Sequence, residues 1–505
     1  MTFNKYTWFG CKAAFVLLFL TVCNAGYAAT PLPNGTIKTF FEEWRLPGNE
    51  CTGMVELGVS HRFTKNFSAG FGSWMAVTGK RGGFITLGLD GEVSYPLSDK
   101  LSLDSGLFIG AGGGRGGYLL SGGGLMLHTF AGMSYQTASW GKLGAGISYV
   151  DFPIGGTIHS TQPFLSYSVP FTSFTENGWG SKSISLSDSQ YFGLLPKKHS
   201  LALVSRYLHV PSGSLNDTGG RQHDVTLFGV EWRTQLSQNW YAKLETEGAA
   251  GGQSAGYMQI LAGTGYCIPL SEKLFLNTDI STGAGGGGGV DSGGGLLFDV
   301  SSGFQWYVSN MFFAELSAAH ILADTGRFAA NGVSLKVGYK PGADDVTGLN
   351  SVYKQVCMRV RAVTQSYFQA SDKWRTHHAN QQVDNLGIQM DYFINPYWYA
   401  TGQGLAAYRG NAGAYMTGLV GSGVRINLLK ALHGNVEALV GAAGGGGLAM
   451  GSGLVWQGNA GIGYDISPFI SAMVTAGRMQ ACNGAFRANV AGVSLAWQFT
   501  SYQKK

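Results

Sequence analysis

The stretch ITLGLDGEVSY at residues 85–95 places Ile, Leu, Leu, Gly, Val and Tyr on one face of an extended chain. The other face carries Thr, Gly, Asp, Glu and Ser. Alternation with a period of two is typical of a β-strand that has one apolar face. The same alternation recurs in Leu143–Tyr149, Val225–Gln235 and Asn489–Phe499. Segments of about ten residues separated by turns are the pattern of transmembrane β-strands, so the sequence predicts an all-β membrane protein.

The composition agrees with this interpretation. Glycine supplies 79 of 505 residues, aromatic residues 13% and charged residues only 12%. A hydrophobic share of 45% excludes a disordered chain, and the absence of a three-residue glycine period excludes collagen. Glycine costs a helix about 1 kcal/mol per position, so an ordinary helical enzyme is not expected.

An internal repeat organises the chain. The segment GAGGG at 110–114 recurs as GAGGG at 283–287 and, more loosely, as GAAGG at 441–445. The turn PLSDK at 96–100 recurs as PLSEK at 269–273, and both motifs have the same offset (283 − 110 = 269 − 96 = 173). The offset to the third copy is 441 − 283 = 158. Three copies are therefore predicted, over residues 36–174, 199–341 and 352–499.

Each copy is predicted to hold eight strands, so the chain is expected to form an antiparallel transmembrane β-barrel of 24 strands as three repeats of eight. Two closures fit this repeat. The linkers between copies are short and strand edges in lipid cannot stay unpaired, which favours one large barrel with a wide lumen. Small inward residues suit the crowded interior of the alternative, three consecutive 8-stranded barrels.

The connections between strands alternate in length. Tight turns occur at 63–66, 98–100 and 139–141, and longer segments at 47–52, 78–83, 110–124 and 151–160. Short turns on the periplasmic side and long loops outside are the convention of outer-membrane barrels.

The N-terminus has the pattern of a secretory signal peptide. Lys5 and Lys12 accompany an uncharged apolar run at 13–23, and small residues favour cleavage after Ala28. The run is too short to span a bilayer, and no longer apolar run follows it. The predicted location is the outer membrane. The four remaining cysteines are widely spaced without a CxxC pair, so no zinc site is expected.

The last strand adds a resemblance. Val493, Leu495, Trp497 and Phe499 form one apolar face that ends in an aromatic residue. This face resembles the C-terminal sorting signal of Gram-negative outer-membrane β-barrel proteins, which implies recognition by the barrel-assembly machinery. The chain departs from the usual pattern because six residues, 500–505, follow Phe499. The resemblance is to this class and to no specific family.

The glycine-rich segments 110–124, 283–295 and 441–453 are expected on the outer side, where inward folding would narrow a pore. The alternative is a set of flexible surface loops. The candidate pore-loop residues are Gly112, Gly113, Gly114, Arg115, Gly285, Gly286, Gly287, Gly444, Gly445 and Gly446. The candidate lumen-facing residues are Glu56, Arg62, Asp90, Glu92, Asp104, Glu231, Arg233, Glu245, Glu247 and Asp279.

Enzymatic or cofactor chemistry is not expected. Gly112, Gly114 and Gly117 satisfy GxGxxG without the βαβ context that a nucleotide site needs. The adjacent His377 and His378 lack a carboxylate cluster for a metal. No catalytic residue, metal site or cofactor is therefore predicted.

An outer-membrane loop enzyme that uses Asp151, His159 and Ser160 is the weakest alternative, because a triad needs a geometry that sequence cannot supply.

The expected partners are outer-membrane lipids, lipopolysaccharide and a periplasmic protein that docks near the linkers 174–199 and 341–352. Lys80, Arg81 and Arg375 are candidate contacts for lipopolysaccharide phosphates, together with Arg221 and Arg409. No block of basic residues supports nucleic-acid binding.

The predicted function is an outer-membrane channel for a polar solute or polymer, with neutral cargo such as glycans favoured by the sparse lumen charge. The alternative is a non-conducting structural or adhesive protein whose barrels display loops.

Overall fold

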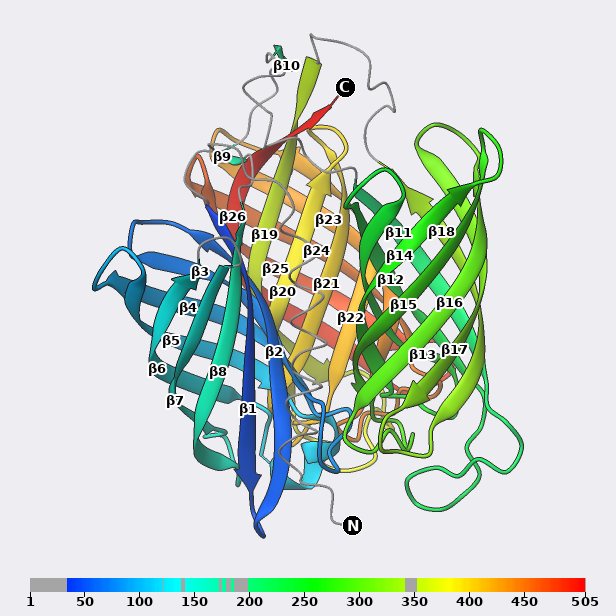
Figure 1. Ribbon diagram of the computed structural model, residues 1–505. Coiled ribbons are helices and arrows are strands. Elements are labelled where there is room, and N and C mark those ends of the chain that lie inside the picture. The colour runs from blue at the N-terminus through cyan, green and yellow to red at the C-terminus, as the bar shows by residue number, and fades with distance from the viewer. Residues whose placement is uncertain are drawn as a thin grey trace.

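A computed structural model describes residues 34–120, 122–137, 141–171, 175–178, 183–185, 199–340 and 352–504. Over these ranges the chain is antiparallel β-structure with one short 3₁₀ helix, η1 (Gly114–Leu120). None of the helical structure there is long and apolar enough to cross a membrane. The expected signal peptide lies outside the described residues. Figure 1 shows three barrels that stand side by side, with the two longest strands projecting at one end.

Barrel 1 is formed by the first eight strands. They are β1 (Gly35–Leu46), β2 (Glu50–Arg62), β3 (Phe67–Ala76), β4 (Ile85–Pro96), β5 (Leu101–Gly112), β6 (Met126–Thr137), β7 (Gly141–Asp151) and β8 (His159–Phe171). Each strand pairs with the next, and β1 also pairs with β8 from Gly35↔Phe171 to Glu42↔Phe164. The sheet therefore closes on itself.

Barrel 2 repeats this arrangement. Its strands are β11 (His199–His209), β12 (Val225–Gln235), β13 (Trp240–Gly252), β14 (Met258–Pro269), β15 (Leu274–Gly286), β16 (Leu296–Tyr307), β17 (Phe312–Ala323) and β18 (Ala329–Tyr339). The ring closes where β11 pairs with β18, from Leu201↔Tyr339 to His209↔Asn331.

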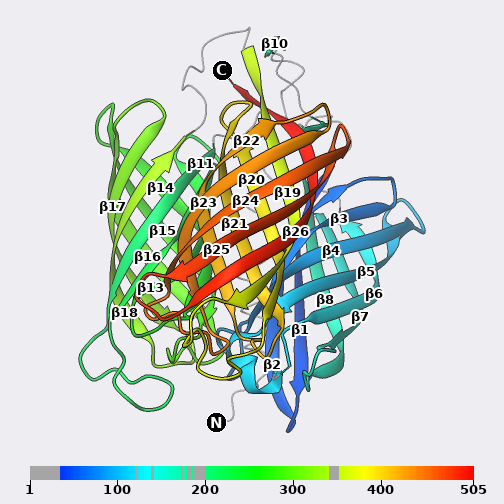
Figure 2. The ribbon, with the colours of Figure 1, turned by 180° about the vertical axis from the view of Figure 1, so that it is seen from behind.

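Barrel 3 is the longest. Its strands are β19 (Val352–Gln369), β20 (Val383–Phe393), β21 (Trp398–Arg409), β22 (Met416–Asn427), β23 (Leu432–Gly444), β24 (Leu454–Ser467), β25 (Ile470–Ala481) and β26 (Arg487–Lys504). The pairing of β19 with β26 closes the ring and continues beyond it. Two short strands, β9 (Thr175–Asn177) and β10 (Ser183–Ser185), add to the projecting ends of β26 and β19 (Figure 1). Figure 2 shows barrel 3 from behind, with β26 across its face.

The repeat of eight antiparallel strands is confirmed, but the preference for one 24-stranded ring is wrong. The alternative of three consecutive barrels is the closure that forms. The physical reason lies at the ends of each repeat, where the first and last strands satisfy each other's backbone groups. The described strands of the three barrels therefore have no unpaired edge, and the argument that favoured a single ring does not apply.

Side chains alternate between two environments along each strand. Outward residues such as Leu165, Leu316 and Val474 are more than half exposed although they are apolar. Inward neighbours such as Phe164 and Ser317 are buried. Aromatic residues that include Tyr95, Trp232, Trp240, Trp306, Trp398 and Tyr464 remain exposed near the tight-turn ends of their strands. An apolar band with aromatic residues at its border suits contact with lipid.

The outward face is buried where the barrels meet. One hydrophobic cluster, the junction cluster, combines Met75, Ile85 and Ala111 of barrel 1 with Ile260 and Ala284 of barrel 2 and Ala406 and Met416 of barrel 3. These residues lie near the long-loop ends of the third to fifth strands of each barrel. Ala111 and Ala284 occupy equivalent positions (284 − 111 = 173). The repeat thus predicts which face of each barrel touches its neighbours.

Glycine loops complete this junction in a cyclic order. A Cβ on Gly83, in the loop after β3, would lie 2.4 Å from the backbone of Gly286 in barrel 2. A Cβ on Gly444 of barrel 3 would lie 2.1 Å from the backbone of Gly256 in barrel 2.

The third contact closes the cycle, because a Cβ on Gly113 of barrel 1 would lie 2.6 Å from the carbonyl of Gly413 in barrel 3. The loop after the third strand of each barrel therefore meets the glycine-rich loop of the next barrel, a head-to-tail contact that closes after three steps.

Backbone hydrogen bonds cross two of these contacts. Gly82 N donates to Gly293 O at 2.8 Å between barrels 1 and 2, and Asn411 N donates to Gly122 O at 2.9 Å between barrels 3 and 1. Ser452 Oγ donates to Ala250 O at 3.2 Å between barrels 3 and 2. The three barrels are consequently held as one body at their long-loop ends.

Replacing Gly444 by Ala tests the junction. The added methyl group overlaps the backbone around Gly256, so we expect the free energy of unfolding in micelles to fall by about 1–3 kcal/mol, the usual cost of overpacking. Gly402→Ala is the matched control in the same barrel, because a Cβ there meets no atom within 4 Å. Equal urea midpoints for the two variants would contradict the role of glycine at this contact.

Candidate functional site

The interior of each barrel is filled, and its long-loop end is apolar. In barrel 2, Leu208, Leu227 and Leu261 form a buried cluster together with Val290, which comes from the glycine-rich loop. Barrels 1 and 3 have the same arrangement. The loop residues Leu119 and Leu120 join the cluster of barrel 1, and Leu448 and Met450 join that of barrel 3. Each glycine-rich loop therefore contributes apolar side chains that close its own barrel.

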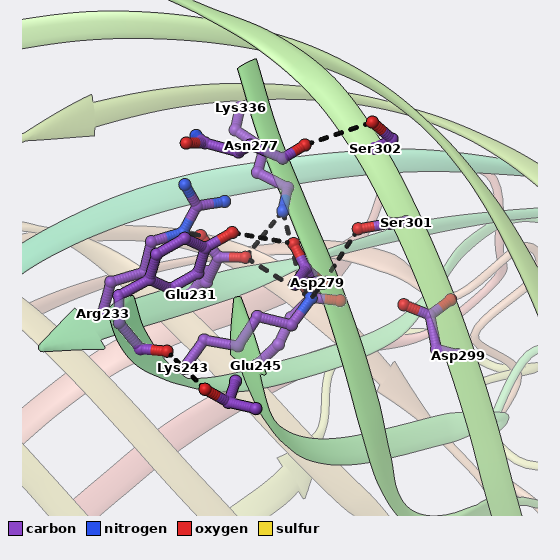
Figure 3. A network of polar contacts seen from close by, with 12 residues as sticks. Glu231, Arg233, Lys243, Glu245, Asn277, Asp279, Asp299, Ser301, Ser302 and Lys336 are labelled. Carbon is purple, nitrogen blue, oxygen red and sulfur yellow. Dashed lines mark hydrogen bonds and ion pairs between the residues drawn. The ribbon is translucent and has the colours of Figure 1, made fainter. Parts of the chain in front are cut away.

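Below this apolar layer, barrel 2 holds a network of ion pairs (Figure 3). The Arg206 guanidinium contacts three carboxylates: Asp299 at 3.0 Å, Glu247 at 3.2 Å and Glu245. All four side chains are at most 1% exposed. A buried charge is tolerated only when it is paired and hydrogen-bonded, and this network meets that condition by sharing cations among acids.

A second part of the network lies nearer the tight turns. Lys336 Nζ lies 2.6 Å from Glu231 Oε2, and Lys243 Nζ lies 2.5 Å from Asp279 Oδ1. In Figure 3 these four side chains converge from different strands toward the centre of the barrel. Arg233 forms a bidentate pair with Glu315, with both nitrogen–oxygen distances at 2.8 Å. This geometry crosses the barrel and leaves no wide aqueous lumen.

Barrel 3 also pairs its buried charges, but its interior contains fewer charged side chains and more amides. Arg359 Nε lies 2.6 Å from Asp391 Oδ2, and Arg361 Nη2 lies 2.7 Å from Asp391 Oδ1. Arg361 also contacts Glu437 at 2.5 Å, and the Tyr399 hydroxyl donates to Glu437 Oε1 at 2.8 Å. Buried Gln389, Gln403 and Gln457 fill the space around them.

Barrel 1 is filled mainly by aromatic rings. Phe40 and Phe130 pack with centroids 4.8 Å apart, and Trp44 and Trp74 with centroids 5.7 Å apart. Among its buried carboxylates, that of Glu42 accepts hydrogen bonds from Trp44 Nε1 at 2.9 Å and Gln162 Nε2 at 2.8 Å and lies 2.8 Å from His128 Nε2. The three barrels thus have the same arrangement of strands but different side chains in their interiors.

The candidate lumen-facing residues lie at several depths. Glu56, Asp104, Glu231, Arg233, Glu245, Glu247 and Asp279 are buried inside barrels, Asp90 and Glu92 are half-buried, and Arg62 is exposed at the end of β2. The structure brings the five residues of barrel 2 into one network and keeps those of barrel 1 apart from it.

Three of the candidate pore-loop glycines lie at the contacts between barrels: Gly113, Gly286 and Gly444, at equivalent positions in the three repeats (286 − 113 = 173; 444 − 286 = 158). Arg115 forms an ion pair of 3.2 Å with Asp217 of barrel 2. The remaining candidates, Gly112, Gly114, Gly285, Gly287, Gly445 and Gly446, lie in the same three segments. A part for these loops in narrowing a pore remains a prediction.

The C-terminal strand continues past the sorting-signal residues. Leu495 is exposed on the outside of barrel 3, Trp497 is half-buried and Phe499 is buried. Residues 500–504 continue β26, and their backbones pair with β19 from Thr500↔Cys357 to Lys504↔Tyr353. Residues 500–504, which depart from the usual C-terminal pattern, are therefore an extension of the strand. Recognition by the barrel-assembly machinery remains a prediction.

Two of the loop arginines that were expected to contact lipopolysaccharide form ion pairs or hydrogen bonds within the protein. Arg81 pairs with Glu50 at 2.7 Å, and Arg375 donates to the carbonyls of Gly410 at 2.7 Å and Asn411 at 2.8 Å.

A carboxylate forms hydrogen bonds within the long loop of barrel 2. The Tyr207 hydroxyl and the Val210 backbone N–H donate to the carboxylate of Asp224 and lower its pKa to about 2.

The sequence analysis did not predict several interior residues, among them Arg206, Lys243, Lys336 and Glu315. The signal that could have found them is the two-residue phase of their strands, because Arg206 shares a face with Val204 and Leu208. That phase is hard to read where both faces are apolar near the long loops. Over the described residues, no group of histidine, cysteine and acidic side chains has the arrangement of a metal site.

Comparison with known proteins gives likeness at the level of class. No family model and no curated protein matches the chain. The siderophore receptor PirA from Acinetobacter baumannii is 9% identical, with 94% of this chain and 81% of that chain covered and a TM-score of 0.28. OpdQ from Pseudomonas aeruginosa is 12% identical, with 93% and 98% covered and a TM-score of 0.19.

A structure titled as a de novo design of transmembrane β-barrels is 16% identical and covers 28% of this chain and 94% of that chain, with a TM-score of 0.20. The closed antiparallel barrels of the structure have the fold of the class that the last strand indicated. The TM-scores are too low for the overall arrangement to be shared.

Arg206→Met tests the network in barrel 2. The loss of the guanidinium leaves Glu245, Glu247 and Asp299 without their shared cation, so we expect the free energy of unfolding to fall by about 3–5 kcal/mol. Arg327→Met is the control, because Arg327 pairs with Asp291 on an exposed loop and its side chain is 52% exposed. A change of about 0.5 kcal/mol or less is expected there. Similar losses for both variants in urea titrations would refute the assignment.

Proposed function

We propose that the chain is an outer-membrane protein of a Gram-negative bacterium whose three sealed barrels act as one membrane-embedded body that displays structured loops. The observation that carries this proposal is that side chains fill the centre of every barrel. An apolar layer lies at the long-loop end, and ion pairs, amides or aromatic rings lie beneath it. Eight-stranded barrels have an interior just wide enough for such side chains.

The orientation follows from the connections. Short turns lie at the end where the chain passes between barrels, and the long loops lie at the opposite end (Figure 1). We place the short turns in the periplasm and the long loops outside, according to the convention for such barrels. The junction cluster and its glycines then lie at the outer leaflet, where they hold the loops of three barrels as one surface.

Transport of a polar solute is the second candidate. The observation that favours it is a cavity of about 500 Å³ at the tight-turn end of barrel 2, which reaches inward to Arg233. A solute that continued from there would have to displace the Arg233–Glu315 pair and the apolar layer beyond it. This passage would be gated, in contrast to free diffusion through an open lumen.

Electrical recording separates these functions. We expect folded wild-type protein in a planar bilayer to give no stable conductance of porin size, and liposomes that contain it to swell in sugars no faster than empty liposomes. The reason is that closed barrels leave no continuous water path. A stable, large conductance from the wild-type chain would overturn the sealed-barrel proposal and favour the channel.

Lipid contact is tested by spin labels at neighbouring positions. Leu316 is 59% exposed on the outside of β17, and Ser317 is 4% exposed on its inside. A label on Leu316→Cys should be relaxed strongly by oxygen, which concentrates in lipid, and weakly by a water-soluble nickel complex. The label on Ser317→Cys serves as the control. Relaxation of the Leu316 label mainly by nickel would place this face in water and reject the membrane assignment.

A further inference from the structure

The cavity at the tight-turn end of barrel 2 is much larger than the space that corresponds to it among the described residues of barrel 1. The corresponding space in barrel 1 is about 20 Å³ and is lined by Phe130 and Phe164. The walls differ as well, because Phe130 and Phe164 line the space in barrel 1, whereas Asn277 and Gln305 line the cavity in barrel 2.

The walls of this cavity combine aromatic rings with amides. Phe275 and Tyr307 pack edge to face with centroids 5.4 Å apart, and both line the space. Gln235, Gln238 and Gln305 line it as well. Rings offer a flat apolar surface to the C–H face of a sugar, while amides both donate and accept hydrogen bonds.

The floor offers an unused acceptor. Asn277 lines the cavity and is 2% exposed. Its Nδ2 donates to Gln305 Oε1 at 2.8 Å and to Glu315 Oε2 at 2.7 Å, whereas its Oδ1 has no hydrogen-bond partner among the described residues. A buried acceptor without a partner is costly, and a ligand hydroxyl would satisfy it.

Lys273 and Lys340 supply positive charge at the cavity, and Glu272 is the one acidic residue in its lining. Arg233 also lines it, but its charge is compensated by Glu315. Lys340 Nζ lies 5.3 Å from the centroid of the Tyr307 ring, which places a cation beside an aromatic wall. An anionic group at the mouth would therefore be attracted, and a hydroxyl-bearing ring would fit below it.

We propose that this cavity binds a small saccharide that carries a carboxylate, with one or two sugar rings. The ring lies against Tyr307, a hydroxyl donates to Asn277 Oδ1, and the carboxylate lies between Lys273 and Lys340. A volume of about 500 Å³ falls within the range of ordinary ligand sites. Binding does not depend on whether the barrel conducts, so it stands apart from the function proposed above.

Isothermal titration of the micelle-solubilised full chain with digalacturonic acid tests this proposal. We expect saturable binding, and binding of neutral galactobiose about tenfold weaker because it lacks the carboxylates. The double variant K273Q/K340Q should lose about tenfold in affinity for the acid and little for the neutral sugar, since the two lysines contact the carboxylate.

Lys100→Gln is the matched control. Lys100 occupies the same turn position in barrel 1 (273 − 100 = 173), where the interior cavity is too small for a sugar. Its affinity for digalacturonic acid should equal that of the wild type. Absence of saturable binding up to about 10 mM, or equal affinities for wild type and K273Q/K340Q, would overturn the proposal. Neither outcome would bear on conductance, which is measured separately.

Discussion

The backbone's need for hydrogen-bond partners in a lipid environment determines the architecture. A strand in hydrocarbon has no water for its N–H and C=O groups, so every edge must pair. Here the last strand of each repeat returns to the first, as in Gly35↔Phe171 and Leu201↔Tyr339. Closure after eight strands fixes the width of each barrel, and that width decides what can lie inside it. The filled centres of the barrels follow from this early closure.

A narrow barrel must then be packed with side chains that satisfy one another. Barrel 1 uses stacked aromatic rings, which bury area without a charge to compensate. Barrel 2 uses arginine and lysine shared among carboxylates, and barrel 3 relies more on glutamine and asparagine. Ion pairs of this kind contribute little net stability, but loss of one partner is severe. The interior of barrel 2 is therefore rigid at its centre and open only near the tight turns.

The sequence predicted the strands, the repeat of eight and the class of protein, because a two-residue alternation and a constant offset are visible in one chain. It could not decide between one ring and three. That choice depends on the pairing of β1 with β8, a contact between residues more than one hundred positions apart that leaves no local pattern. The interior network was found in part: Glu231 and Glu245 alternate with outward residues, whereas Arg206 lies among apolar residues on both faces of β11.

The contacts between barrels explain why the glycine motif recurs. Some positions that face a neighbouring barrel are alike in all three repeats, as with Ala111, Ala284 and Ala442 (442 − 284 = 158). Others differ, since Met75 and Ala406 both lie in the junction cluster at equivalent positions (406 − 75 = 173 + 158). Positions that face a barrel's own interior are free to differ, as with Gly106, Asp279 and Glu437, because no neighbour touches them. Glycine recurs where the backbones of two copies come close, and side chains differ more where each copy is enclosed. Early closure thus lets one repeat acquire a binding cavity without altering the other two.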